Sequence, residues 1–244
     1  MNSSDDIERA LRWPAEAPGI DLREAEQLAL FRDLVPLFDG VPERRYKTNG
    51  MYGPADASLY QAMVRHLSPQ RVVEVGSGYS TAKLLDTAEY LLPDLRVTCV
   101  EPYPDRLLAL LKSGDKVDVT VCPVQDADME IFTSLEDSDI LFIDSTHVAK
   151  AGSDVVWLFL HVLPRLRKGV VVHVHDIFWP FEYPAQWHNE GRNWNEDYFL
   201  HAFLCNNSAW RIEVFSSWLW HRHSELVPSD LRAESPGSIW LRRC

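Results

Sequence analysis

From residue 71 onward, short runs of apolar and β-branched residues alternate with segments that carry apolar residues at helical spacing. The runs predict strands, and the segments between them, such as 152–166, predict helices. The predicted strands are residues 71–76, 96–102, 117–122, 139–144 and 169–176. Because strands that alternate with helices form a parallel sheet covered on both faces, we expect an α/β fold with a doubly wound sheet.

Both ends of the chain depart from this alternation. Residues 1–50 are predicted to form helices and loops, and a further helix begins at about Ala55. After an aromatic-rich loop, residues 177–194, we expect one helix and then two strands, "WRIEVFSSWLW" and "GSIWLRR", with no helix between them. Such strands indicate an antiparallel pair at one sheet edge. The expected organisation is a cap segment, residues 1–54, followed by one ligand-binding domain, residues 55–244.

The composition limits the class of protein. With 244 residues, 46% of them hydrophobic, the chain can bury the core of one globular domain. A formal net charge of −12 argues against broad binding to nucleic acid or to anionic membranes. No segment has the roughly 20 apolar residues that span a bilayer, the acidic start differs from a secretory signal, and the cysteines form no CxxC pair. We therefore expect a cytoplasmic protein.

The stretch "VVEVGSGYST", residues 72–81, joins a predicted strand to a predicted helix through a Gly-x-Gly turn. Such a turn lets the backbone approach a ligand, and the helix start offers free N–H groups. The dinucleotide fingerprint would have a third glycine where Thr81 stands, and the Glu74 carboxylate would repel a pyrophosphate. Glu74 instead suits a cationic ligand such as S-adenosylmethionine. Glu101 ends the next strand, where a ribose-binding acid is expected.

Three motifs in this order, "EVGSGYST", "VEPYP" and "ILFIDSTH", resemble those of class I S-adenosylmethionine-dependent methyltransferases. The variant is similar to the small-molecule O-methyltransferase-like group, which carries E-x-G-S-G-x-S-T and F-I-D-x-x-H. The resemblance covers the chain from about residue 50 to its C-terminus. It implies a Rossmann-like, seven-stranded, doubly wound sheet with the last strand antiparallel, and it implies that residues 55–244 form the S-adenosylmethionine-binding domain.

The resemblance also implies a cofactor site. Glu74 would contact the amino end of the methionine moiety, Glu101 the ribose, and Gln125 or Asp126 the adenine. The full set of implied cofactor residues is Glu74, Gly76, Ser77, Gly78, Ser80, Thr81, Glu101, Gln125, Asp126 and Asp144. The hydroxyl residues of this set have a second interpretation, since serine and threonine also cap turns and helices.

Acidic and histidine residues stand at the ends of two predicted strands that should be neighbours. Asp144 ends one strand, with His147 three residues on, and His175 and Asp176 end the other. The resemblance implies that Asp144, His175 and Asp176 could bind a divalent ion. Because a histidine replaces an oxygen ligand, the set favours manganese, iron, nickel or zinc over magnesium. His147 or His175 is the candidate general base beside Asp144, and His173 is expected in the core. The alternative is that these acids cap local turns.

The loop after Asp176 is rich in aromatic residues, namely Phe178, Trp179, Phe181, Tyr183, Trp187 and Trp194. An aromatic or sugar-like acceptor could pack beneath such a loop at the mouth of a cofactor site. The alternative is a packed surface loop or a subunit contact in a homo-oligomer.

These patterns favour a methyltransferase that uses S-adenosylmethionine to methylate a small molecule at a hydroxyl oxygen, with a divalent metal or a histidine base assisting. An NAD-dependent oxidoreductase on a similar sheet and a non-catalytic cofactor-binding module on the same fold stay open as alternatives. A metal-centred hydroxylase is a further alternative that rests on the aspartate and histidine set alone.

Overall fold

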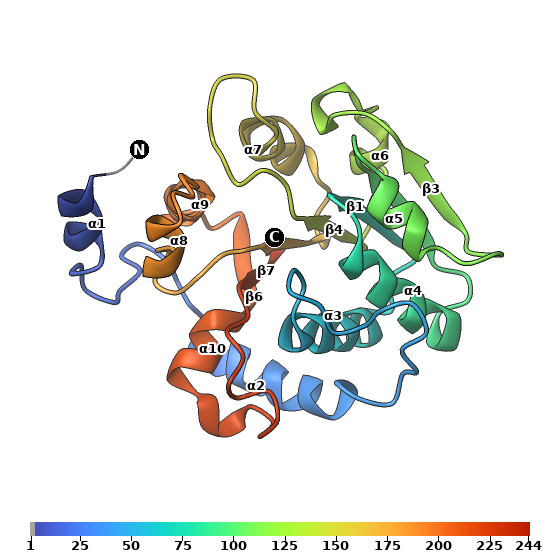
Figure 1. Ribbon diagram of the computed structural model, residues 1–244, viewed down its shortest axis with the longest axis horizontal. Helices are drawn as coiled ribbons and strands as arrows, with labels where there is room; N and C mark the ends of the chain where they lie inside the picture. The colour runs from blue at the N-terminus through green and yellow to red at the C-terminus, as the bar shows by residue number, and fades with distance from the viewer. Residues whose placement is uncertain (1–2) are drawn as a thin grey trace.

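The computed structural model describes residues 3–244, and Figure 1 shows a central sheet with helices packed around it. Within these residues the sheet has seven strands in the order β3-β2-β1-β4-β5-β7-β6. β7 runs antiparallel to both of its neighbours, and the other pairs are parallel. The strands are β1 (Arg71–Val75), β2 (Arg96–Val100), β3 (Val117–Thr120), β4 (Ile140–Ile143), β5 (Val171–His175), β6 (Trp210–Phe215) and β7 (Ser238–Arg243). The predicted doubly wound α/β fold with an antiparallel last strand is confirmed.

Helices cover both faces of this sheet. The α-helices are α1 (Ser4–Ala10), α2 (Glu24–Leu34), α3 (Pro54–Leu67), α4 (Tyr79–Leu91), α5 (Asp105–Leu110), α6 (Glu130–Thr133), α7 (Asp154–Trp157), α8 (Ala185–Asn189), α9 (Glu196–Leu204) and α10 (Ser216–Arg222). Shorter turns of helix are η1 (Val35–Leu37), η2 (Val124–Asp126), η3 (Leu158–Val162), η4 (Leu163–Arg165) and η5 (Ser224–Leu226). In Figure 1, α3 lies on one side of the sheet and α7 on the other. None of the helices found in residues 3–244 has the length and apolar character to cross a bilayer.

The middle strands are buried on both faces. Every residue of β4 and β5 is buried, whereas β3, at the sheet edge, is partly exposed. Burial on both faces explains why β4 is a continuous apolar run and why β5 is apolar apart from His173 and His175. Since β1, β4 and β5 are parallel neighbours, their carboxyl ends share one edge of the sheet, and the glycine turn, Asp144 and Asp176 all follow there.

The segment before α3 makes polar contacts with both the C-terminal strands and the first half of the sheet region. Gln27 of α2 accepts a hydrogen bond from the Phe215 N–H of β6 at 2.7 Å. Farther along, the Arg45 guanidinium is buried and pairs with Asp86 at 3.0 Å and with Asp115, whose Oδ2 lies 2.9 Å from Nε. The segment before α3 therefore contacts β6 at one end, and α4 and the turn before β3 at the other.

The tail contains a helix that the hydrophobic pattern did not predict. β6 ends at Phe215, and "SSWLW" begins α10 instead of continuing the strand, so the expectation of no helix between the last two strands was wrong. The Ser216 hydroxyl donates to the Ser238 carbonyl at 2.9 Å and accepts from the Ser238 N–H at 2.8 Å. A side chain therefore takes the place of the backbone in the ladder, which frees the backbone to form a helix.

Two other expectations need correction. The predicted helix 152–166 is divided into α7, a π turn at η3 and a 3₁₀ turn at η4. Pro164 lies in η4 and has no N–H to donate, so a regular α-helical ladder cannot continue through it. The predicted loop 177–194 includes the short helix α8.

Candidate functional site

The glycine turn after β1 fits tightly against the end of β4. The Gly76 N–H donates to the Val100 carbonyl at 3.1 Å, and the Asp144 N–H donates to the Val75 carbonyl at 2.9 Å. Gly76 has a φ of +79°, and a Cβ on it would overlap the carbonyl oxygen of Asp144. Glycine is therefore required here so that the turn can lie against Asp144, a reason that concerns packing as much as ligand approach.

Glu74 lies under this turn and is fully buried. The Tyr60 hydroxyl donates to Oε1 at 2.8 Å, and the Thr81 hydroxyl donates to Oε2 while it accepts the Gly78 N–H at 3.1 Å. Burial disfavours the charged carboxylate and outweighs the two hydroxyl donors, so the pKa of Glu74 rises to about 7. Glu74 is thus a buried acid that side chains of α3 and α4 hydrogen-bond, and it is partly protonated and partly ionised near neutral pH.

Glu101 meets the turn from the end of β2. Its Oε2 accepts the Ser77 N–H at 3.0 Å, and its Oε1 accepts the Tyr103 N–H at 2.9 Å. Glu101 is half-buried, so its carboxylate keeps access to a ligand. The structure therefore brings Glu101 and the glycine turn together, as the motif order predicted.

The remaining residues of the predicted cofactor set lie around this turn or beside it. Ser80 is buried in the first turn of α4, and the Ser77 hydroxyl is buried with no partner among the described residues. Gln125, in η2, donates from Nε2 to the Gly152 carbonyl at 2.8 Å, and Asp126 is exposed. The Gln125 amide therefore links η2 to the segment before α7.

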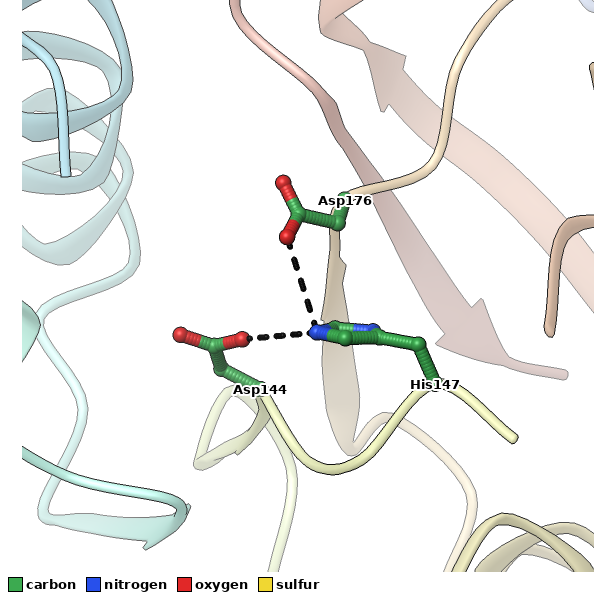
Figure 2. A group of neighbouring side chains, drawn as sticks. All are labelled: Asp144, His147 and Asp176. Carbon is green, nitrogen blue, oxygen red and sulfur yellow. Dashed lines mark ion pairs between the residues drawn. The ribbon is translucent and has the colours of Figure 1, made fainter. Parts of the chain in front are cut away.

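Asp144, His147 and Asp176 converge at the carboxyl ends of β4 and β5. The Nε2 atom of His147 lies 3.3 Å from Oδ1 of Asp144 and 3.5 Å from Oδ2 of Asp176. Figure 2 shows the imidazole pointing between the two carboxylates. One ligand atom from each residue lies within 4.8 Å of the other two, a spacing that suits a metal ion. Two carboxylates and an imidazole make a mixed N/O donor set that suits a transition metal.

The other face of His147 is held by Glu196, the first residue of α9. The Nδ1 atom of His147 lies 2.9 Å from Oε2 of Glu196, which is fully buried. The Asn195 N–H donates to the His147 carbonyl at 3.0 Å, and the Trp194 ring packs on the imidazole with centroids 4.3 Å apart. A carboxylate on Nδ1 fixes the tautomer and directs Nε2 toward the two aspartates.

No pattern in the sequence pointed to Glu196. An acid at the first position of a helix is common, because it interacts favourably with the helix dipole. Glu196 also lies 49 residues after His147 in the chain, so only the packing of α9 beside the loop after β4 brings the two together.

His175 lies beside this group, on the side of α3. Its Nδ1 is 3.3 Å from Oδ1 of Asp176 and 3.8 Å from Oδ1 of Asp144. Its Nε2 is 3.9 Å from Oδ2 of Asp56, a buried acid that no sequence motif marked. The predicted set of Asp144, His175 and Asp176 is therefore assembled, but the compact group of three ligand atoms includes His147 in place of His175.

The acids and histidines influence one another's protonation. Burial raises the pKa of Asp56 to about 7. Burial also opposes the charged forms of Asp144 and His175, but opposite charges outweigh it. His175 and His147 lower the pKa of Asp144 to about 2, and Asp176 and Asp144 raise that of His175 to about 10. Asp144 and Glu196 likewise raise the pKa of His147 well above its usual value, although burial opposes this. The site thus favours an ionised Asp144 between protonated His147 and His175.

His173 is part of the core, as expected. It is buried between Phe142, with ring centroids 4.2 Å apart, and Trp240, at 4.6 Å. Neither ring nitrogen has a hydrogen-bond partner among the described residues, and burial lowers the pKa of His173 well below its usual value. His173 is thus a neutral core residue, and the candidate functional histidines are His147 and His175.

Two residues of the site have left-handed backbone conformations. His147 has a φ of +59° and Asp176 a φ of +56°. Non-glycine residues rarely adopt this region, and such conformations concentrate at functional sites. In both cases the turn directs the side chain back over the end of its strand.

Comparisons with known proteins identify the domain. Residues 73–177, which contain the glycine turn, Asp144 and Asp176, match a family described as a methyltransferase domain. An uncharacterized protein of Archaeoglobus fulgidus is 34% identical over 145 residues, which cover 53% of this chain and 64% of the relative's length. The fold is that of the S-adenosylhomocysteine-bound methyltransferase PaMTH1 from Podospora anserina, at 16% identity, 92% coverage of this chain, 97% of the other and a TM-score of 0.50.

Residues 73–177 therefore match the methyltransferase-domain family, and the chain has the fold of the methyltransferase PaMTH1. This match agrees with the methyltransferase expected from the order of the motifs.

Proposed function

We propose that this protein is an S-adenosylmethionine-dependent methyltransferase that acts on a hydroxyl oxygen of a small molecule. The observation that carries the proposal is the meeting of buried Glu74, half-buried Glu101 and the Gly76 turn at the edge where Asp144 follows β4. A buried carboxylate under such a turn attracts the ammonium group of the cofactor, and the second carboxylate accepts hydrogen bonds from ribose hydroxyls. The bound S-adenosylhomocysteine named for PaMTH1 supports this choice of ligand.

The cofactor residues follow from the geometry of the turn. Glu74 would face the amino end, the backbone from Gly76 to Gly78 would line the ligand, and Glu101 would hold the ribose while the Ser77 N–H orients its carboxylate. Ser80 or Thr81 would hydrogen-bond the cofactor carboxylate from the start of α4; the Thr81 hydroxyl already donates to Glu74, which favours Ser80. Gln125 or Asp126 would be the adenine contact.

Asp144, His147 and Asp176 would hold a divalent ion at the acceptor end of the site. The donor set fits such an ion, and the Glu196 carboxylate behind His147 is the support that metal-ligating histidines usually have. When bound, the ion would act as a Lewis acid that lowers the pKa of the acceptor hydroxyl. Without the ion, His147 would be the general base at Nε2, and His175 is the second candidate. Because neighbouring carboxylates raise the pKa of both histidines, either one would have to release its proton before it could act as a base.

In the transfer, the acceptor oxygen forms a bond to the methyl carbon as the bond from that carbon to sulfur breaks, and the hydroxyl proton goes to a base or to solvent. The products are a methyl ether and S-adenosylhomocysteine. Asp144 lies between the two halves of the site, since its backbone contacts the glycine turn and its carboxylate contacts His147. Residues 1–54 would act as a cap, and residues 55–244 would be the cofactor-binding domain.

Calorimetric titration with S-adenosylhomocysteine tests the proposal. We expect saturable binding to the wild type and a clear loss of affinity in Glu101→Ala. The matched control is Glu190→Gln, an acid on the protein surface. Absence of binding to folded protein, or binding of NADH in a fluorescence titration instead, would overturn the assignment. Metal content by elemental analysis of the wild type and of Asp144→Ala with Asp176→Ala tests the metal site, and equal content in both would refute it.

A further inference from the structure

A large groove lies beside the candidate site. It has a volume of about 1160 Å³ and runs between the N-terminal segment, residues 10–18, the aromatic loop, residues 178–187, and the C-terminal segment, residues 232–236. This volume is somewhat larger than the range of about 300–1,000 Å³ that is typical of small-molecule sites. The groove is a distinct feature, because its walls do not include Asp144, His147 or Asp176.

Aromatic rings form much of the groove wall. The tryptophans that line it are Trp13, Trp179, Trp187 and Trp220. Phe178 packs edge-on against Trp187, with ring centroids 5.0 Å apart, and both rings line the groove. Flat apolar faces of this kind favour a ligand that has an apolar ring face of its own.

The wall also contains a carboxylate held in one orientation. Oε1 of Glu182 lies 2.6 Å from the Tyr198 hydroxyl, 2.9 Å from Nε2 of His188 and 3.0 Å from the Tyr183 N–H. Oε2 of the same carboxylate is buried and has no hydrogen-bond partner in residues 3–244. Leaving a buried carboxylate oxygen without a donor is costly, so Glu182 is prepared to accept a hydrogen bond from a ligand.

A donor complements this acceptor. The indole Nε1 of Trp179 is likewise buried without a partner in the part of the chain that the structure describes. Trp179 and Glu182 are three residues apart in the same loop, and both line the groove. Hydroxyl groups of a ligand would satisfy both atoms, since a hydroxyl can donate to Glu182 and can accept from Trp179.

The charges near the groove argue for a neutral ligand. Three carboxylates, Glu16, Glu182 and Glu234, and one guanidinium, Arg232, line it, and this excess of negative charge disfavours an anion. A cation is disfavoured at the tryptophans, because Arg192 already lies 4.4 Å from the Trp187 ring centroid and Arg222 lies 5.9 Å from that of Trp179.

We propose that this groove binds a neutral saccharide ring, which stacks on the tryptophans and bonds through its hydroxyls to Glu182 and Trp179. The ring would be the part of the methyl acceptor remote from the reacting oxygen, a role that rests on the proposed function. The start of α9 contacts both the groove and the acid–histidine group. The Phe178 N–H donates to Asp197 at 3.1 Å, and Asp197 follows Glu196, which holds His147.

Binding without cofactor tests the groove independently of methyl transfer. Labelled protein is applied to an array of natural glycans, and the saccharide bound most strongly is titrated by calorimetry. We expect Glu182→Gln to lower the affinity about tenfold or more and Trp179→Phe, which removes only the N–H, to lower it several-fold. Glu24→Gln, an exposed acid of α2 outside the groove, serves as the control, and thermal melts establish that the variants are folded.

Three results would overturn the proposal: no neutral glycan bound by folded protein, binding confined to amino or sulfated sugars, or equal affinity in the wild type and in both groove variants. Titration with S-adenosylhomocysteine is carried out on the same samples. Saccharide binding without cofactor binding would refute the proposed function alone, and the reverse would refute the groove alone.

Discussion

The Nδ1 atom of His147 lies 2.9 Å from the Oε2 atom of Glu196, a carboxylate with no solvent exposure. This contact ties the loop after β4 to α9 and leaves Nε2 as the only ring nitrogen of His147 directed at Asp144 and Asp176. Glu196 is thus a positioning residue for the candidate metal site, although it contacts neither aspartate within hydrogen-bond distance.

Glu196→Gln should weaken metal binding without abolishing it. The amide cannot orient His147 as the carboxylate does, and loss of such a partner typically costs about 10–100-fold in metal affinity. Titration of metal-free protein with Mn²⁺ or Zn²⁺ measures this directly. Asp144→Ala should lose binding altogether, whereas Glu190→Gln should resemble the wild type. Unchanged affinity in Glu196→Gln would show that Glu196 has no part in metal binding.

Binding of S-adenosylhomocysteine should release a proton from Glu74. In the unliganded protein the pKa of Glu74 is about 7 because of burial, so near neutral pH a large fraction of the carboxyl is protonated. The ammonium group of the ligand favours the ionised form, and the affinity should therefore rise from pH 6 to pH 8. Calorimetry in buffers of different ionisation enthalpy counts the proton. In Glu74→Gln the proton release and the rise in affinity should both disappear, and their persistence would assign them to another group.

Glu74 should also affect the stability of the unliganded protein in a defined pH window. Its folded pKa is raised above the usual 4.5, so its contribution is fully present below pH 4.5 and is lost as the pH rises through 7. The size of the change is up to about 3 kcal/mol in the free energy of unfolding. Urea unfolding of the wild type and Glu74→Gln across pH 4.5–8 measures the difference. A wild-type stability that stays parallel to that of Glu74→Gln would contradict the raised pKa.

Gly76→Ala should destabilise the protein far more than Gly114→Ala. Both glycines have positive φ values, +79° and +97°, so both substitutions carry backbone strain of about 1 kcal/mol. Only at Gly76 would the added Cβ overlap the Asp144 carbonyl oxygen, whereas nothing lies within 4 Å at Gly114. Chemical unfolding should show an additional loss of at least about 2 kcal/mol at Gly76, and metal binding should weaken because Asp144 is displaced. Equal losses in the two variants would refute tight packing at Gly76.

The motif residues could be placed from the sequence because each stands at the end of a strand. The period of the apolar residues located β1, β2, β4 and β5, and parallel strands bring their carboxyl ends to one edge. That reasoning predicted that Glu101 would meet the glycine turn and that Asp144 would lie near Asp176, which is what the contacts show.

The doubly wound sheet, the likeness to methyltransferases and the sheet edge where the motif residues meet could all be predicted from the sequence, because they depend on local periodicity and on the order of strand ends. The packing of α9 determines which histidine forms the compact group of ligand atoms with the two aspartates, because it places Glu196 behind His147. The tertiary structure also decided that "SSWLW" is a helix, through the Ser216 hydroxyl and its contact with Ser238. Contacts between residues distant in the chain leave no periodic trace, so the pattern along the chain could not reveal them.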